Sequence, residues 1–445
     1  MNKLIKKALP SAIALALLGG ANLVSAAVNV QCPGDTNGDS VIDTPDLDHP
    51  NAVCTHLIAG DNFSVMSDGN PMYIFGFADR TGDLPEDVIG NGILDAEWPG
   101  TTIELDQGDE FYLSLSNVGT VMRPDLFDPH TVHFHGFPNA GTVFDGVPEV
   151  SISINHGATL TYYYNIVEPG TYIYHCHVEA SEHMEMGMLA NLYVHPIQDE
   201  TGCGAGCAVA GRKGGPGGGA AIGEPEGYTY NDGDGTTGWD VEKPIQLSSF
   251  DPDFHDASVF VQPLPFAALE AKYPMINGRG YPQTLWPMAA DPLNPGVAEI
   301  GAPMDNAAPV AGHPIGKITG TGGEVLSNGS ATQTLDSAVT VTQGKTLLLR
   351  LSNVSIDRFY TLKAQGLPMK IVATGSRQLR GVTGKNLYRD VSSVNFGGGE
   401  THDVLIDTTD VAVGTYFLHS AELHQMSNLT QLDGGMITEI EVLAP

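Results

Sequence analysis

Two short segments of this chain are rich in histidine, cysteine and methionine, the residue types that commonly bind redox-active metals. Residues 129–136 contain three histidines, and residues 174–188 contain three more together with Cys176 and Met188. These segments hold six of the 15 histidines in a chain of 445 residues. A lone histidine is usually a surface or core residue, but clustering of this density indicates a metal site.

The donor types favour copper over zinc. One thiolate with two imidazoles and a thioether is a soft trigonal set with a weak axial ligand, which is typical of electron-transfer copper. Structural Zn²⁺ takes closed tetrahedral sets of cysteine and histidine. We therefore predict a type 1 copper site formed by His130, Cys176 and His183, with Met188 as the axial ligand.

Side-chain alternation along an extended strand predicts a second metal centre beside the first. His175 and His177 flank Cys176, so both point to the face opposite the thiolate. His133 and His135 share a face in the same way. We predict that Cys176 and its two flanking histidines are the catalytic group, which carries electrons from one centre to the other.

The surrounding sequence is typical of an all-β protein with two similar domains. Short alternating segments separated by Gly, Pro and Asp turns predict an antiparallel sandwich over residues 57–197. Residues 198–228 are Gly-rich and nearly free of bulky apolar side chains, which predicts a linker. Alternation resumes in residues 229–445, where 344–353 echoes 108–117. We predict two Greek-key β-sandwiches, the second largely without metal ligands.

The first residues are typical of a secretory signal peptide. Three lysines precede an apolar run, and Val24-Ser25-Ala26 resembles a small-residue cleavage site, so residues 1–26 are predicted to be removed near Ala26. No later segment is long and apolar enough to span a bilayer. We expect a secreted or periplasmic protein, in a compartment where disulfides persist.

Residues 27–56 form an acidic loop between two cysteines. Four of the five cysteines fall into local pairs, Cys32 with Cys54 and Cys203 with Cys207, which leaves Cys176 over. Oxygen donors between the first pair recur at the spacing of an EF-hand loop. This spacing predicts a calcium site formed by Asp35, Asn37, Asp39, Val41 through its carbonyl, Asp43 and Asp46. The alternative is a disulfide-stapled acidic loop without metal.

The charge balance excludes one class of partner. The chain has 20 Lys and Arg against 52 Asp and Glu, a formal net charge of -32. Such an acidic surplus repels phosphate backbones, so we expect no nucleic-acid partner. The same surface would concentrate cations or basic partners.

The two histidine-rich segments resemble the copper motifs of multicopper oxidases, His-x-x-His-x-His-Gly and His-Cys-His followed by a downstream His and Met. The two-domain layout is similar to that of two-domain laccases and copper nitrite reductases, whose domains are cupredoxin sandwiches. The resemblance implies copper as the cofactor and dioxygen, reduced to water, as the acceptor. It implies type 1 ligands His130, Cys176, His183 and Met188, a type 2 ligand His133, and type 3 ligands His135, His175 and His177.

The chain also departs from the family pattern. The family's trinuclear cluster takes eight histidines from four His-x-His pairs, and only two such pairs are present. Ala421 stands where the second histidine of the family's Gly-Thr-Tyr-x-x-His-Ser-His element is expected. His419 of that element is a candidate ligand across a subunit interface, as in the nitrite reductases, which implies a homotrimer. The alternative is a hydrogen-bonded histidine without metal.

Several functions therefore stay open at this point. The electron donor is expected to be a small molecule such as a phenol, a metal ion or a redox protein. One alternative is a type 1 copper electron carrier or copper-binding protein without oxidase activity. Another is a nitrite-reductase-like enzyme, against which His133 occupies the position of an essential Asp and His177 has no counterpart.

Overall fold

The computed structural model describes residues 29–202, 225–260, 263–285, 332–333 and 335–445. The expected signal peptide and the pair Cys203 and Cys207 lie outside the described residues. None of the described helices combines the length and the apolar character needed to cross a lipid bilayer.

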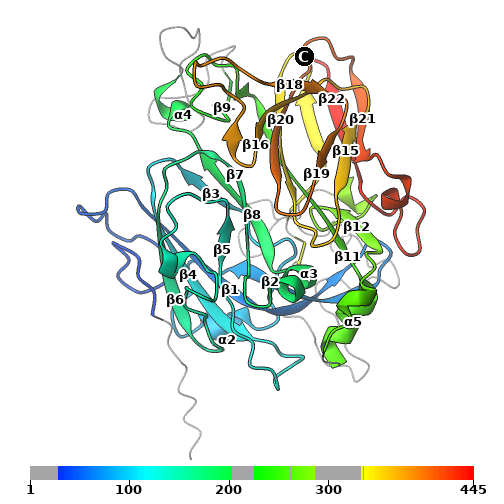
Figure 1. Cartoon of the computed structure of the whole chain (residues 1–445). Coiled ribbons are helices and arrows are strands. Elements are labelled where there is room, and N and C mark those ends of the chain that lie inside the picture. The colour runs from blue at the N-terminus through cyan, green and yellow to red at the C-terminus, as the bar shows by residue number, and fades with distance from the viewer. Residues whose placement is uncertain (1–28, 203–224, 261–262, 286–331, 334) are drawn as a thin grey trace, which may run out of the picture.

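The first sandwich consists of two four-stranded sheets (Figure 1). One sheet has the order β2-β1-β4-β6 and the other β3-β8-β7-β5. The strands are β1 (Ala52–Val65), β2 (Pro71–Asp79), β3 (Ile103–Asp106), β4 (Glu110–Gly119), β5 (His133–His135), β6 (Thr159–Asn165), β7 (Gly170–His175) and β8 (Leu189–His195). Short helices α2 (Val88–Gly92), η1 (Thr142–Phe144) and α3 (Ala180–Met186) lie between them.

The second sandwich repeats this plan with more strands. Its larger sheet has the order β12-β11-β14-β20-β16-β17 with β18 paired to β16, and its smaller sheet has the order β13-β22-β21-β15-β19. The strands are β11 (Val241–Phe250), β12 (Tyr273–Ile276), β13 (Val339–Thr342), β14 (Thr346–Asn353), β15 (Tyr360–Ala364), β16 (Met369–Thr374), β17 (Arg377–Gln378), β18 (Arg389–Val391), β19 (Val394–Phe396), β20 (Thr401–Asp407), β21 (Gly414–Ser420) and β22 (Ile437–Leu443). Its helices are α5 (Pro252–Phe260), η2 (Phe266–Ala268), η3 (Gln283–Leu285) and η5 (Leu423–Met426).

The internal sequence repeat corresponds to a repeat in topology. Strand β4 pairs in parallel with β1, and the matching strand β14 pairs in parallel with β11. Strands β7 and β21 likewise each pair antiparallel with the strand that follows them in sequence. Alternating apolar residues of β4 and β14 enter the cores of their sandwiches, in line with a period of two. The all-β, two-sandwich prediction is confirmed.

The two ends of the predicted linker are structured. Helix α4 (Gln198–Thr201) begins it and β9 (Gly227–Tyr228), paired with β10 (Gly238–Trp239), ends it. The Asp199 carboxylate accepts a hydrogen bond of 2.7 Å from the Tyr228 amide, which brings the two ends together.

Helix α5 belongs in sequence to the second domain but packs on β2 of the first (Figure 1). Phe254 on this helix and Leu264 after it are part of the hydrophobic core of the first sandwich. The two ring nitrogens of His255 lie 2.5 Å from the Tyr73 carbonyl and 3.0 Å from the Glu185 carbonyl. Burial lowers the pKa of His255 to about 4, so the neutral ring donates to one of these carbonyls at a time. The boundary between the domains in sequence is therefore not the boundary in space.

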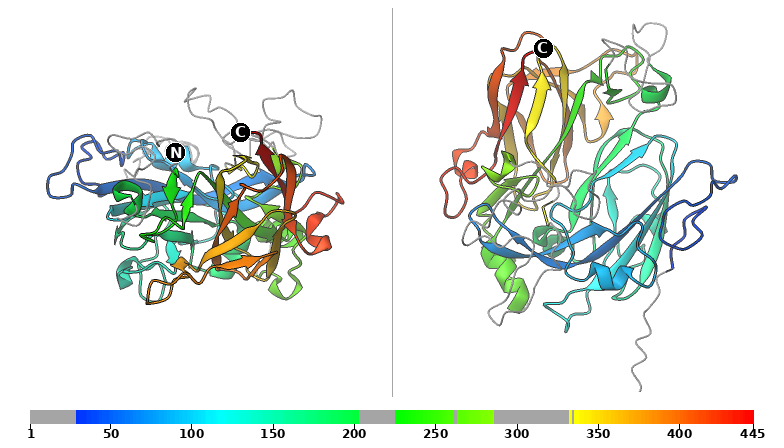
Figure 2. Two further views of the ribbon diagram at one scale, coloured as in Figure 1. Left: turned by 90° about the horizontal axis from the view of Figure 1, so that it is seen from above. Right: turned by 180° about the vertical axis from the view of Figure 1, so that it is seen from behind.

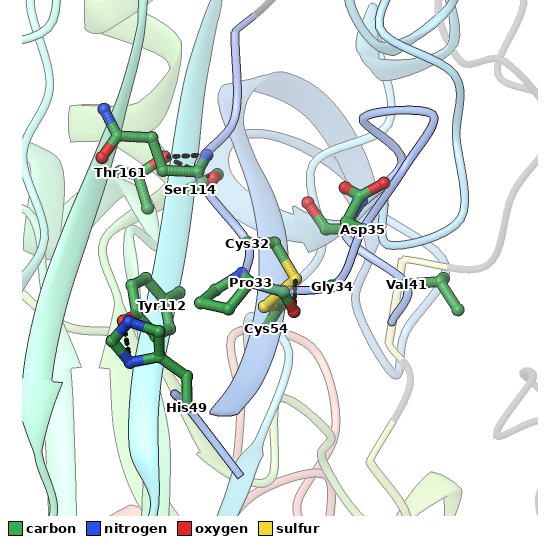
Figure 3. Close-up of a disulfide and its surroundings, with 12 residues drawn as sticks. Cys32, Pro33, Gly34, Asp35, Val41, His49, Cys54, Tyr112, Ser114 and Thr161 are labelled. Carbon is green, nitrogen blue, oxygen red and sulfur yellow. Dashed lines mark hydrogen bonds between the residues drawn. A yellow bond between two sulfur atoms is a disulfide. The ribbon is translucent and has the colours of Figure 1, made fainter. Parts of the chain in front are cut away.

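The disulfide Cys32–Cys54 ties the loop before β1 to the first residues of that strand, because Cys54 lies within β1 (Figure 3). The Asp35 carboxylate accepts hydrogen bonds from the amides of Asn37, Gly38 and Ser40. Among the described residues, these carboxylates do not form a group of three donors within 4.8 Å of one another. The acidic side chains cap loop amides, and the geometry gives the calcium prediction no support.

Figure 2 shows the two sandwiches from two further directions. A buried arginine links them. Arg350 of β14 is fully buried, is ion-paired with Glu242, and lies 3.9 Å from a carboxylate oxygen of Asp403. It also donates 3.0 Å to the Thr171 hydroxyl of β7 and lies over the Tyr193 ring. The carboxylates of its own domain thus neutralise its charge, while its Nη1 donates to the first domain.

We expect Arg350→Ala to lower the free energy of unfolding by about 3–5 kcal/mol, because it leaves buried carboxylates without their counter-charge. Arg377→Ala is the matched control, since Arg377 pairs with Glu168 across the same junction but is 60% exposed. Such a surface pair contributes about 1 kcal/mol or less. Thermal unfolding by calorimetry checks both values, and equal effects of the two changes would contradict the assignment.

Candidate metal centre

The chain turns sharply after β7 and returns in β8, and this turn presents three of the four predicted type 1 ligands. The Cys176 amide donates to the Met188 carbonyl at 3.1 Å, which closes the turn. Helix α3 within it carries His183, and Gly187 caps its C-terminus with a φ of 117°, which favours glycine. The Gly187 and Met188 amides both donate to the His183 carbonyl, so the turn holds His183 and Met188 close to Cys176.

His130, Cys176, His183 and Met188 form what we call the thiolate site. The Cys176 sulfur lies 3.2 Å from Nδ1 of His183 and 3.8 Å from Nδ1 of His130. Met188 is fully buried in the same core cluster as Cys176. Among the described residues, His130, Cys176 and His183 are the group whose three donor atoms all lie within 4.8 Å of one another.

The thiolate site is polarised before any metal enters. Burial by itself raises the pKa of a thiol, but the charge and hydrogen bonds of His183 and His130 lower the pKa of Cys176 to about 5. Burial opposes the charged form of His183 as well, yet the thiolate and Asp128 hold its pKa well above the usual range. The metal-free site therefore contains the deprotonated sulfur that a soft metal binds.

His133, His135, His175 and His177 form a second group, the histidine cluster. Strand β5 pairs antiparallel with β7 and sets His133 opposite His175. Five of the ring-to-ring distances in the cluster fall between 5.1 and 6.2 Å. Burial lowers the pKa of His175 to about 3, so its ring is neutral and able to bind a metal.

Backbone carbonyls orient three rings of the cluster. Nδ1 of His133 bonds to the Asp145 carbonyl at 2.5 Å, and Nδ1 of His175 to the Cys176 carbonyl at 2.8 Å. Nδ1 of His135 bonds to the Gly399 carbonyl, a contact from the second domain. A carbonyl accepts only from a protonated nitrogen, so these bonds leave Nε2 of each ring as the metal-binding atom.

The two groups thus use opposite ring nitrogens. In the thiolate site Nδ1 faces the sulfur, and in the cluster Nδ1 is bonded to the backbone. The cluster opens into a cleft of about 660 Å³ between the domains. Its far wall is formed by residues 355–359 and 397–400 of the second domain.

The structure does not bring His419 to the cluster of its own chain. His419 lies in β21 between Lys363 and Ile437 and does not line the cleft. Its Nδ1 bonds to the Ser420 carbonyl at 2.7 Å, which is the same arrangement as in His175. His424 is exposed in η5 and lines a different pocket.

One residue at the thiolate site was missed by the sequence analysis. An Asp128 oxygen lies 3.1 Å from Nε2 of His183, and its other oxygen lies 3.9 Å from Nε2 of His130. Burial raises its pKa, but the His183 hydrogen bond and the fields of both imidazoles bring it below the usual range. Its place two residues before His130 was the available signal, but acidic residues are common throughout this chain.

Comparison with protein-family models and with known relatives points to copper-containing oxidases. Two models described as multicopper oxidase match residues 87–199 and 301–442. An iron transport multicopper oxidase of Gibberella zeae is 38% identical over 96 residues, which are 21% of this chain and 14% of the relative. An L-ascorbate oxidase of Cucurbita pepo var. melopepo is 31% identical over 111 residues, 24% of this chain and 18% of the relative. The chain thus matches less than a fifth of each relative's length.

Solved structures share the fold over most of the chain. The blue copper oxidase of Nitrosomonas europaea has a TM-score of 0.55 at 18% identity, covering 88% of this chain and 86% of that one. The copper nitrite reductase of Nitrosomonas europaea has a TM-score of 0.51 at 14% identity, covering 88% and 94%. At such low identity these likenesses support the two-sandwich fold and no more.

The low pKa of Cys176 can be measured in the copper-free protein. As the pH rises through about 5, ultraviolet thiolate absorbance should appear, whereas an ordinary cysteine ionises at about 8.5. Cys176→Ser is the control that removes this absorbance and leaves any signal from other cysteines. A thiolate transition that stays near the ordinary value would contradict the polarised site.

Proposed function

Because the chain belongs to the multicopper oxidase family, we propose that it is a copper oxidase that withdraws electrons one at a time from a donor. The thiolate site would hold type 1 copper, and the histidine cluster would hold part of a multinuclear copper site at which dioxygen is reduced to water. The observation that carries this proposal is the sequence His175-Cys176-His177, in which one residue of each group is bonded covalently to the other.

The donor atoms fit copper. A buried thiolate with two Nδ1 atoms facing it and a buried thioether nearby is a soft, closed set. The cluster offers imidazoles only, which suit copper that binds oxygen ligands. Copper supplies one-electron redox chemistry at both places when bound.

The thiolate site would then accept electrons, and the histidine cluster would be the place of oxygen reduction. Cys176 and its flanking histidines provide a short covalent path between the two groups. The buried thiolate site excludes bulk water, because His130 and His183 are 0% and 1% exposed. The histidine cluster opens to the cleft, which gives dioxygen and water a way to reach it. Electron entry and oxygen reduction are thus kept on opposite faces of one strand.

A second copy would complete the cluster, in a homotrimer. The bond of Nδ1 to the Ser420 carbonyl leaves Nε2 of His419 as its metal-binding atom. His419 lies on the same face of β21 as Phe417, which is 47% exposed. An exposed aromatic side chain beside an oriented imidazole fits a protein interface. His419 from a neighbouring subunit would then add a ligand to the four that one chain provides.

We propose the electron donor and the cellular compartment of the protein only as general classes. A phenol, a reduced metal ion or a redox protein would serve as donor, and the net charge of -32 would attract cationic donors. Secretion or export to the periplasm would follow from cleavage of the predicted signal peptide near Ala26. Calcium binding at residues 35–46 is proposed on the sequence spacing alone.

Two substitutions in the relay separate the parts of this mechanism. Cys176→Ser should abolish the blue thiolate absorption band, because it removes the sulfur. His177→Ala should abolish oxygen consumption while the blue band persists, because it damages only the cluster. Copper content and EPR spectra of the copper-loaded wild type complete the test. A single type 1 copper per chain would indicate an electron carrier, and more copper with an EPR-silent part would support the oxidase.

His419→Ala tests completion of the cluster by a neighbouring subunit. We expect less copper per chain and lost oxygen consumption, with the type 1 EPR signal unchanged, because His419 serves only the cluster. His424→Ala is the control, since its exposed ring lines another pocket. Analytical ultracentrifugation gives the oligomeric state, and full copper content in His419→Ala would refute the shared site.

A further inference from the structure

A single carboxylate faces the outer nitrogens of both histidines of the thiolate site. Asp128 places one oxygen 3.1 Å from Nε2 of His183 and the other 3.9 Å from Nε2 of His130. The Asp128 side chain is 10% exposed, more than either imidazole. We propose that Asp128 is the positioning residue of this site: it fixes the orientation and tautomer of His183, acts on His130 through its charge, and lowers the reduction potential of the site. The inference rests on the proposed type 1 copper.

The backbone around Asp128 is held firmly enough to position a side chain. The side-chain amide of Asn117 donates to the Asp128 carbonyl at 2.8 Å and to the Ile154 carbonyl at 2.9 Å. His130 and Ile154 then exchange two backbone hydrogen bonds. Residues 128–130 are therefore fixed to the end of β4 on one side and to Ile154 on the other, so the carboxylate has a defined place.

Asp128 provides a hydrogen-bond acceptor for a buried imidazole N–H of the thiolate site. Each Nδ1 faces the sulfur and must be unprotonated to bind copper, so each ring carries its proton on Nε2. A buried N–H without an acceptor is costly. Asp128 accepts from His183 directly, whereas Nε2 of His130 has no hydrogen-bond partner within the described residues. The carboxylate thus holds His183 in the coordinating tautomer and leaves His130 a purely electrostatic partner.

The charge of Asp128 also acts on the metal. A buried negative charge next to the ligands stabilises the more positive oxidation state, because the local dielectric constant is low. Cu(II) is therefore favoured over Cu(I), and the reduction potential is lower than the same ligands would give with a neutral neighbour. Partner groups of this kind orient metal-bound histidines and tune their basicity.

Asp128→Asn in the copper-loaded full-length chain tests the charge. The amide keeps the size and an oxygen acceptor, so we expect the blue band to persist and the reduction potential of the type 1 copper to rise. Asp125→Asn is the matched control, because it removes the same charge from a nearby position. Asp125 is 66% exposed and paired with Arg123. An unchanged potential in Asp128→Asn, or an equal rise in Asp125→Asn, would overturn the charge effect.

Asp128→Ala and Asp128→Glu test the orientation. The alanine variant should change the copper hyperfine splitting in EPR and weaken copper binding by about 10–100-fold, as loss of such partners does. The glutamate variant keeps the charge, so its potential should stay near that of the wild type and its copper affinity should be partly restored. If Asp128→Asn does not fold, this pair decides the matter. Wild-type EPR and copper affinity in the alanine variant would overturn the positioning role.

These outcomes are distinct from failure of the proposed function. A wild-type protein without a type 1 EPR signal would refute the copper assignment itself. A wild-type signal that none of the Asp128 variants alters would refute this inference alone.

Discussion

The geometry of this protein depends on the alternation of side chains at the end of β7. His175 and His177 point to one side and Cys176 to the other, so two chemically different groups share a single stretch of backbone. The pairing of β7 with β5 and β8 then fixes what each side meets. A shift of the strand by one residue would exchange the thiolate with an imidazole and destroy both groups.

Much of this could be predicted from residue types and spacing. The donor set around Cys176 and the opposite direction of its neighbours follow from local periodicity. The structure brings His130, Cys176 and His183 together and groups His133 with His175 and His177, and copper binding at these places stays a prediction. Asp128 could not be recognised, because a sequence rich in acids does not show which one meets an imidazole in space. The choice between Nδ1 and Nε2 also depends on carbonyls of Asp145 and Gly399, which are distant in sequence. The second domain's part in the first domain's core was hidden for the same reason.

The two sandwiches share a plan but differ at equivalent strand ends. After β7 the chain has Cys176, which faces two imidazoles, whereas at the end of β21 the chain has Ser420 and then Ala421. The Ala421 amide donates to the Thr361 carbonyl, so the backbone pairing persists there although neither Ser420 nor Ala421 supplies a thiolate or an imidazole. The second domain contributes walls and supports instead, through Arg350 at the junction and the Gly399 carbonyl at His135.

Helix α5 makes the core of the first sandwich depend on residues that are synthesised later in the chain. Because Phe254 and Leu264 complete the hydrophobic core around Cys176, a chain that ends at the first sandwich would leave that core open. His255 adds a support under the turn that carries His183. The metal-binding half is therefore finished only when more than half of the polypeptide has emerged. A nascent chain that ends before Phe254 would hold Cys176 in an incomplete core, where the thiol is open to oxidation until the residues that bury it have been made.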